Sequence, residues 1–428
     1  MLLALGLLLV GAQAAMAETP THSGVTVTGA GATFPLNMIE QWKSDFNKST
    51  GATIAYTGVG SGGGRQQLIA GTVDFAGSDV AAAATEVDQL KAKYGDFVYI
   101  PETSGAVAVL FKVPGLTSLK LTGPTLAKIF AGGITNWNDA AIAADNGAPG
   151  PNLPIQVFVR SDKSGTSGVF TEYLSKAGAP NWAAGITQTF PTDKGQIGKA
   201  GSDGVANAVN ASSGGIGYAE HSFAAERAIP EVMVKNGGGQ FRPPDAASVT
   251  AAIDDATLNP DGTLGLNFTT TNPEAYPIST VSYLMVPTKM DGDKGDNLKA
   301  FISYALSDAG QAKATPLGYS PLPSKVRTMA QAQLAKVNPV SATAAPAPAP
   351  APVAAPSPAP KPAPAPKPAP APAPKPATQS SVAAQTQDPA LASTGAGTTL
   401  ALALAGLLLV AGGVAFGAGR PRGATARS

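Results

Sequence analysis

The chain of 428 residues is long for one domain, carries a formal net charge of +1 and contains no cysteine. The length predicts two lobes with additional segments, and a near-neutral charge without a basic stripe argues against a nucleic-acid partner. Without cysteine the chain offers no disulfide, no thiolate metal site, no cysteine nucleophile and no lipid attachment through an N-terminal cysteine. Its two histidines, His22 and His221, are too few for a histidine metal site or a Ser-His-Asp triad. We therefore expect no metal and no cofactor.

The N-terminal residues 1–17 have the pattern of a secretory signal peptide. An apolar run through Val10 is followed by Ala15-Met16-Ala17, a small-residue cleavage site before Glu18. A buried N-terminal helix is the alternative interpretation. We expect the folded part of the protein to be secreted.

Strands and helices alternate along the next part of the chain, which predicts an α/β fold with mainly parallel sheets. The apolar periodicity predicts strands over 24–28, 52–57, 73–76 and 97–100, and helices over 34–50, 65–70 and 85–94. The helix over 34–50 carries Met38, Ile39, Trp42 and Phe46 on one face, and Gly51 is placed to end it.

Two long apolar strands, 104–113 and 279–286, are predicted to lead into a second lobe and back out of it. The first lobe then comprises residues 18–104 and 278–338, the second comprises residues 105–277, and the ligand cleft lies between them. Within the second lobe we expect helices near 125–130, 168–174 and 204–209 and strands over 155–159, 215–219 and 231–234. A helix over 293–307 returns to the first lobe, which closes near 317–323.

The C-terminal part changes character from about residue 339. Residues 339–390 are rich in Pro and Ala and are expected to form an extended spacer, although a proline-rich ligand for a partner module is an alternative. The sequence Leu391-Ala392-Ser393-Thr394-Gly395 follows, then an apolar run over 398–418 and a basic tail over 419–428. The apolar run is long enough to span a bilayer, and the arginines of the tail suit its cytoplasmic side.

Three separated segments have the composition of an anion site. They are Gly31-Ala32-Thr33-Phe34-Pro35, the glycine-rich residues 58–64, and residues 160–167, which run from Arg160 to Ser167. Each follows a predicted strand and precedes a predicted helix, where free backbone N–H groups and the helix dipole favour negative charge. Hydroxyl groups add neutral donors, and Arg160 adds a cationic one that Asp162 can orient. A fourth segment, residues 73–79, ends in the carboxylate of Asp79, which is unusual beside an anion.

Two stretches resemble catalytic or nucleotide-binding motifs, but their context favours simpler interpretations. Residues 58–63 match G-x-G-x-x-G, but only about fifteen residues separate the flanking strands, against roughly thirty in a dinucleotide-binding unit. A plain glycine-rich turn is the simpler alternative. Residues 200–204 nearly match a nucleophile elbow, but a helix N-cap at Ser202 or Asp203 explains them equally well. For the Arg160 segment, the corresponding alternative is a surface Arg–Asp pair beside an ordinary N-cap.

Residues 24–330 resemble the phosphate-binding proteins of ABC-type phosphate transporters. The resemblance rests on ordered motifs: residues 28–35, 58–63, 73–79, 134–139, 164–167, 215–218 and 318–323. It implies a two-lobed, type II periplasmic-binding-protein fold that closes on one phosphate. The implied ligand contacts are Thr33, the backbone of Phe34, Ser61, Asp79, Arg160, Ser164, Gly165 and Thr166, with Asp162 paired to the arginine. Lys163 and Arg65 depart from the usual pattern and are expected to alter local charge.

The C-terminal pentapeptide with its apolar run and basic tail resembles a sortase sorting signal with Ala in second place. This resemblance implies cleavage between Thr394 and Gly395 and transfer to peptidoglycan, whereas an uncleaved membrane anchor is the alternative. We expect a monomeric cell-surface phosphate receptor, not an enzyme, that delivers phosphate to an ABC permease. The alternatives are a wall-tethered scavenger or adhesin that is not coupled to uptake, and a surface phosphatase.

Overall fold

The computed structural model describes residues 20–340. The expected signal peptide, the sorting motif, the membrane span, the basic tail and nearly all of the Pro/Ala-rich segment lie outside these residues. Within 20–340, no helix is both long enough and apolar enough to cross a membrane.

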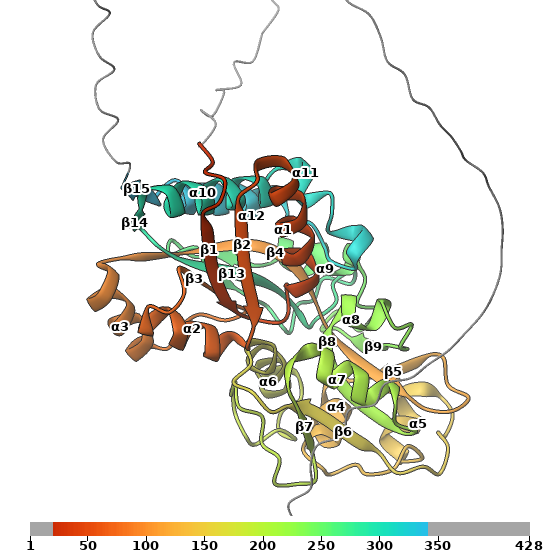
Figure 1. Cartoon of the computed structure of the whole chain (residues 1–428). Coiled ribbons are helices and arrows are strands. Elements are labelled where there is room, and N and C mark those ends of the chain that lie inside the picture. Colours follow the sequence, from red (N-terminus) through yellow and green to blue (C-terminus); the bar gives the residue numbers. More distant parts are fainter. Residues whose placement is uncertain (1–19, 341–428) are drawn as a thin grey trace, which may run out of the picture. The chain divides into compact units, whose positions relative to one another are not determined.

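An eight-stranded mixed sheet runs through both lobes in the order β2-β1-β3-β13-β4-β8-β6-β7 (Figure 1). The strands are β1 (Thr26–Gly31), β2 (Thr53–Gly58), β3 (Phe75–Ser78), β4 (Phe97–Lys112), β6 (Gln156–Arg160), β7 (Ile197–Lys199), β8 (Gly215–Glu220) and β13 (Ser279–Pro287). The first half of β4 pairs with β13 in the first lobe, and the second half pairs with β8 in the second lobe. The long strand β4 thus connects the two lobes, as Figure 1 shows.

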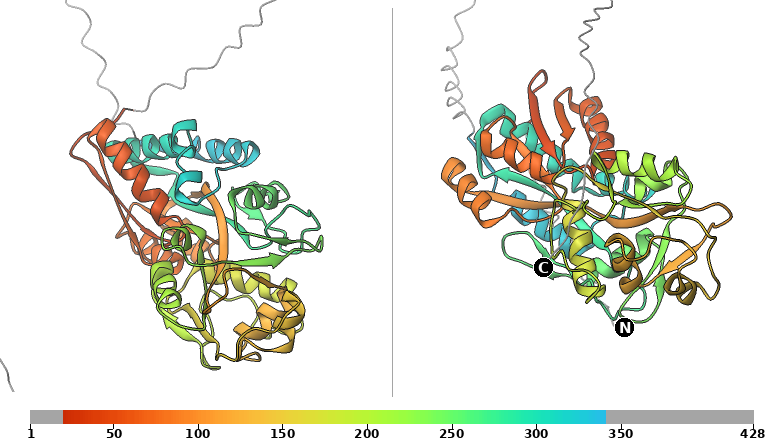
Figure 2. Two further views of the ribbon diagram at one scale, coloured as in Figure 1. Left: turned by 90° about the vertical axis from the view of Figure 1, so that its right-hand side faces the viewer. Right: turned by 90° about the horizontal axis from the view of Figure 1, so that it is seen from below.

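The helices divide between the same two lobes (Figure 2). The first lobe carries α1 (Leu36–Thr50), α2 (Ser61–Ala70), α3 (Ala84–Tyr94), α10 (Gly292–Ala305), α11 (Asp308–Gln311), η1 (Thr315–Leu317) and α12 (Ser324–Leu334). The second carries α4 (Gly123–Phe130), α5 (Ala140–Asn146), α6 (Gly165–Ala177), α7 (Gly201–Asn210) and α8 (His221–Ala225). Helix α9 (Ala246–Asp254) instead packs against β4 and β13. Smaller sheets are formed by β5 (Leu119–Leu121) with β9 (Val232–Lys235) and β10 (Phe241–Arg242), by β11 (Thr257–Leu258) with β12 (Leu264–Gly265), and by β14 (Lys289–Asp291) with β15 (Asn338–Val340).

Helix α1 shows how the apolar pattern builds the first lobe. Its four predicted core residues are buried, and Gly51 ends the helix with a φ of 72°, a left-handed conformation that suits glycine. Burying each large apolar side chain contributes about 1.5–3 kcal/mol. The indole Nε1 of Trp42 also donates to the carbonyl of Gly310 at 2.9 Å. This bond connects α1 to α11, which belongs to the C-terminal segment of the first lobe.

The sheet differs from the predicted one at the two lobe-crossing strands. Residues 97–100 and 104–113 were expected to form separate strands, but β4 is continuous from 97 to 112. This strand contains a β-bulge: Thr103 pairs with Ser282 and Pro101 pairs with Tyr283, so Glu102 has no partner on β13. The expectation of mainly parallel sheets is only partly right, because β4 runs antiparallel to both β13 and β8.

Several element boundaries also differ from the sequence expectation. Helix α2 begins at Ser61 rather than at residue 65, so three of the glycines are helical. One reason is close packing, since a Cβ at Gly64 would lie 2.4 Å from the Cα of Gly31. Helix α7 is capped by Ala200 and begins at Gly201, so the N-cap proposed at Ser202 or Asp203 is wrong. The chain also does not close at 317–323, because α12 follows.

Candidate functional site

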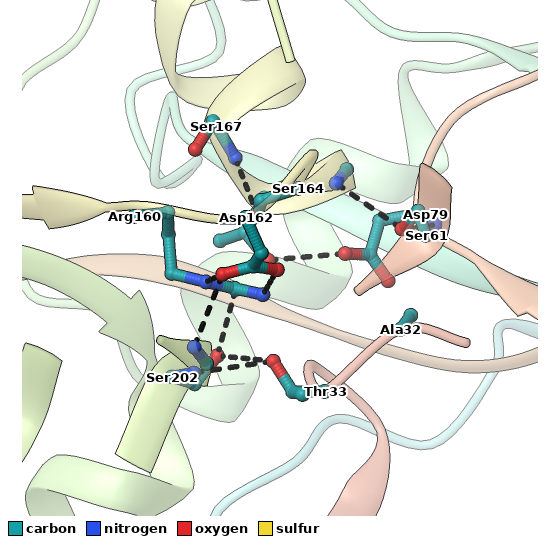
Figure 3. Close-up of polar contacts among 12 residues, drawn as sticks. Ala32, Thr33, Ser61, Asp79, Arg160, Asp162, Ser164, Ser167 and Ser202 are labelled. Carbon is teal, nitrogen blue, oxygen red and sulfur yellow. Dashed lines mark hydrogen bonds and ion pairs between the residues drawn. The ribbon is translucent and has the colours of Figure 1, made fainter. Parts of the chain in front are cut away.

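The predicted anion-binding segments meet between the two lobes (Figure 3). Thr33 follows β1, Ser61 begins α2 and Asp79 follows β3 in the first lobe; Arg160 ends β6 and Ser164 caps α6 in the second. All five residues are buried. The carboxyl ends of parallel strands in open α/β sheets are the usual place for a ligand.

The loop that opens helix α6 lies directly against the first lobe. The hydroxyl oxygen of Ser61 accepts from the backbone N–H of Gly165 at 3.1 Å and from that of Asp79 at 3.2 Å. The Thr166 hydroxyl donates to Oδ2 of Asp79 at 3.0 Å. A Cβ at Gly165 would lie 2.3 Å from Ser61 Oγ, so only glycine permits this approach. The start of α6 thus carries its N–H groups and dipole into the space between the lobes.

Arg160 supplies the cation, and neighbouring oxygen atoms hold its guanidinium group in place. Its Nε donates to Asp162 Oδ1 at 2.8 Å, its Nη2 donates to Oδ2 at 2.5 Å, and its Nη1 donates to Ser202 Oγ at 3.4 Å. Each terminal nitrogen keeps a second N–H that no described residue accepts. The burial of Arg160, whose side chain is 1% exposed, argues against the alternative of a surface ion pair.

Asp79 places a carboxylate among these donors. It receives the Thr166 hydroxyl on Oδ2 and the Ser282 hydroxyl on Oδ1 at 3.2 Å. Burial raises the pKa of Asp79 to about 6, although the Thr166 hydrogen bond and the positive charge of Arg160 oppose that rise. Helix α3 begins at Ala84 with Ala83 as its cap. Asp79 therefore does not cap the helix that follows it.

The two remaining predicted residues have different positions. Thr33 approaches Ser202, with 3.1 Å between the two hydroxyl oxygens, and this contact also joins the lobes. The ring of Phe34 is buried beside Tyr319, whose hydroxyl donates to the carbonyl of Phe34 at 2.7 Å. Only the backbone of Phe34 is therefore suited to a ligand.

Arg65 and Lys163, the two unusual cations, are engaged with Glu86. Arg65 is fully buried and donates to Glu86, Ser78 and Gln188 at 2.7–2.8 Å. Lys163 donates to Glu86 Oε1 at 2.9 Å from the other lobe. We call Arg65, Glu86, Lys163 and Gln188 the interlobe polar network. Both cations are therefore paired with the Glu86 carboxylate and do not point a free positive charge at the candidate site.

Sequence reasoning missed two hydroxyl groups of the site. Ser202 contacts both Arg160 and Thr33, and Ser282 contacts Asp79. The pattern of residues 200–204 indicates a weak catalytic motif or a helix cap, and it does not indicate the contact of Ser202 with Arg160. Ser282 lies inside an apolar strand, and its contact with Asp79 depends on the pairing of β13 with β3 and β4, so no local pattern indicates it. Among residues 20–340 no cluster of three or more His, Cys, Asp or Glu could hold a metal.

A two-lobed α/β fold with its candidate ligand site between the lobes is typical of periplasmic-type solute-binding proteins. Residues 17–309 match the model of the PBP superfamily domain. The chain is 36% identical over 321 residues to the phosphate-binding protein PstS of Haemophilus influenzae, covering 73% of this chain and 94% of the relative. It is 33% identical to PstS 2 of Mycobacterium tuberculosis, covering 73% and 86%. The chain belongs to the PstS family of phosphate-binding proteins.

Solved structures agree with this assignment. A high-affinity periplasmic phosphate-binding protein, determined with bound phosphate, aligns with a TM-score of 0.60 at 27% identity, covering 72% of this chain and 93% of that one. A phosphate-binding protein from Stenotrophomonas maltophilia aligns with a TM-score of 0.56 at 22% identity, over the same shares of the two chains, and supports the fold. The predicted fold class is therefore confirmed.

Proposed function

We propose that this protein captures inorganic phosphate between its lobes and delivers it to an ABC-type phosphate permease. The observation that carries the proposal is the position of Asp79, a buried acceptor among otherwise donating groups. The named function of the curated relatives supports the same ligand. The relatives are named as binding proteins, which supports capture without chemical conversion.

The ligand must carry both negative charge and a proton to suit these groups. Arg160, the N–H groups of α6 and the surrounding hydroxyls favour an anion. An ionised Asp79 only accepts hydrogen bonds, so it requires a donor from the ligand. Phosphate near neutral pH keeps at least one P–OH group, whereas sulfate has none. The site proposed here consists of Thr33, the Phe34 backbone, Ser61, Asp79, Arg160, Ser164, Gly165 and Thr166, with Asp162 and Ser202 orienting the arginine.

Calorimetry of the purified protein against phosphate, sulfate and an organic phosphate tests the ligand assignment. We expect saturable binding of inorganic phosphate and no measurable competition by sulfate. Sulfate binding within tenfold of phosphate would remove the basis of the proposal. A turnover assay with phosphate esters addresses the phosphatase alternative, and uptake of labelled phosphate in a deletion strain addresses the uncoupled scavenger.

The proposal places the folded lobes outside the cell as a monomer that is held at its C-terminus. The support is the sequence alone: a signal-like segment at 1–17, the Pro/Ala-rich spacer over 339–390, and the sorting-like residues 391–395 before the apolar run. If sortase joins Thr394 to peptidoglycan, Thr394→Ala moves the protein from the wall fraction to the membrane fraction. A variant that remains wall-bound contradicts attachment at this position.

A further inference from the structure

A second carboxyl group, Glu102, is buried near the anion site and is not paired. Its side chain is fully buried, and neither carboxyl oxygen has a hydrogen-bond partner among residues 20–340. The hydroxyl of the next residue, Thr103, is also buried without a partner. Buried polar atoms are nearly always hydrogen-bonded, so unpaired ones at one position require a reason.

The β-bulge in β4 accounts for the position of Glu102. Thr103 pairs with Ser282 and Pro101 pairs with Tyr283. Glu102 is therefore an extra residue of β4 that has no partner between these two consecutive residues of β13. Bulges of this kind re-aim side chains and are common beside functional sites. Ser282, on the facing strand β13, donates its hydroxyl to Oδ1 of Asp79 at 3.2 Å. The bulge therefore lies next to the residue that orients Asp79.

The groups that face Glu102 make ionisation unfavourable. The charge of Asp79, at the end of β3, acts on Glu102, and Tyr56 on β2 lies within the influence of the Glu102 charge. The hydroxyl of Ser282 on β13 is near both carboxyl groups and is bonded to Asp79. On α11, the side-chain amide of Gln311 donates to the backbone carbonyls of Glu102, at 2.9 Å, and Ala305, at 2.8 Å, and not to the Glu102 carboxyl group. Burial raises the pKa of Glu102 to about 8; the Ser282 hydroxyl opposes that rise and the charge of Asp79 adds to it. At neutral pH Glu102 is therefore mostly protonated, whereas Asp79, with a pKa of about 6, is mostly ionised.

We propose that Glu102 is a positioning residue for anion selection, a neutral carboxylic acid that keeps the Ser282 hydroxyl directed at Asp79. This inference rests on the proposed phosphate site. Ser282 has one hydroxyl hydrogen, so it donates to either Asp79 or Glu102. A protonated Glu102 is itself a donor and leaves that hydrogen to Asp79. Asp79 then receives Ser282 and Thr166 and retains acceptor sites for the ligand's P–OH group.

Ionisation of Glu102 reverses this arrangement. The anionic carboxylate competes for the Ser282 hydrogen and adds a second negative charge near a site that binds an anion. Phosphate binding then requires Glu102 to regain its proton. Above the pKa of this group, affinity falls by up to about tenfold for each pH unit.

The matched variants are Glu102→Gln, a neutral side chain that still donates, and Glu220→Gln as a control. Glu220 is also fully buried, and burial likewise raises its pKa to about 8. Its Oε2 instead accepts from the backbone N–H of Ser222 at 2.8 Å, and Asp79 is not among the groups that shift its pKa. Glu220→Gln therefore removes a similar buried acid that has no contact with Asp79.

The experiment is calorimetry of the full chain, purified in detergent, with inorganic phosphate at about pH 6.5 and about pH 9.5. Because phosphate titrates identically for each protein, the ratio of the parent Kd to the variant Kd isolates the protein group. We expect that ratio for Glu102→Gln to be near one at the lower pH and to rise by about tenfold or more at the higher pH. The Kd of Glu220→Gln for phosphate should change with pH as the Kd of the parent does. A ratio for Glu102→Gln that does not change with pH overturns the proposal.

A second readout compares proton uptake by the parent and by Glu102→Gln. Near pH 9, dissolved phosphate is the monoprotonated dianion for both proteins, so uptake by the parent in excess of the variant belongs to Glu102. Calorimetry in two buffers of different ionisation enthalpy should show an excess approaching one proton. Equal uptake by the two proteins contradicts the role of Glu102 while leaving phosphate binding intact. If the parent binds no phosphate at any pH, the proposed function itself fails.

Discussion

At the scale of single residues, Arg160 is the one cation among residues 20–340 whose free N–H groups lie at the candidate site. Its terminal nitrogens can each make a charge-assisted hydrogen bond to the ligand, worth about 1.5–3 kcal/mol. Arg160→Ala should therefore weaken phosphate binding by roughly tenfold to several hundredfold, measured by calorimetry. Arg327→Ala, which removes an arginine paired with Asp308 at the surface, is the control and should bind as the parent does. Affinity of Arg160→Ala within about twofold of the parent would exclude Arg160 from the site.

Asp79 determines selectivity at the same scale. Sulfate presents only lone pairs to this carboxylate, so the pair lacks a donor and adds like charges in a buried place. Asp79→Asn supplies an amide donor and should bind sulfate, which reduces the difference in affinity between phosphate and sulfate. Competition calorimetry with sulfate measures this difference in affinity. If Asp79→Asn leaves the discrimination unchanged, selectivity does not arise from counting the ligand's protons.

At the scale of elements, the start of helix α6 decides how closely the lobes approach. A Cβ at Gly165 would lie 2.3 Å from Ser61 Oγ and 2.9 Å from the Asp79 Cβ, both in the other lobe. Gly165→Ala should therefore hold the lobes apart and weaken phosphate binding by about tenfold or more. Its thermal unfolding should change little, because separation of the lobes relieves the overlap.

Gly204→Ala is the matched control for this element. Gly204 also lies in the first turn of a helix, α7, but a Cβ there would approach Lys199 no closer than 3.5 Å. Alanine is a better helix former than glycine by about 1 kcal/mol. This variant should keep its affinity and unfold at the same or a higher temperature. Equal loss of binding in both variants would contradict the packing argument at Gly165.

At the scale of the whole molecule, the interlobe polar network links the stability of the fold to pH. Burial acts to raise the pKa of Glu86, but the Ala83 N–H and the contacts with Lys163 and Arg65 outweigh it and lower the pKa to about 2. A carboxyl whose folded pKa is lowered stabilises the fold above its unfolded value, near 4.5, and loses that contribution as the pH falls toward 2. Glu86→Gln should therefore lower the free energy of unfolding by about 1–3 kcal/mol at neutral pH.

Chemical denaturation at several pH values measures this effect. The difference between the parent and Glu86→Gln should shrink between about pH 4.5 and pH 2, and a difference independent of pH would contradict the assigned role. Lys163→Ala separates contact between the lobes from stability, because it removes one of the network's two contacts with the second lobe and leaves Arg65 paired with Glu86 and Gln188. We expect this variant to release phosphate faster with only a small change in unfolding.

Local sequence patterns were sufficient for much of the fold. The apolar face of α1 and its stop at Gly51 depend on neighbours within a few residues, and the structure agrees with both predictions. The boundaries failed where packing between distant segments decides the backbone. Glycines in residues 61–64 appeared to be a loop, but close packing against Gly31 makes them helical. Short elements such as β5 and β7 have too few residues to carry a period.

By itself, the sequence determined that the chain alternates strands and helices, that donor-rich segments follow several strands, and that a carboxylate stands among them. These properties depend on residue type and short-range order. Only the tertiary structure decided which groups meet: Ser282 on Asp79, Ser202 on Arg160, and Glu102 buried without a partner beside them. Those contacts depend on strand register and on one β-bulge, and a shift of one residue sends a side chain to the opposite face. Register is set by pairing between strands far apart in the chain, and no local pattern contains it.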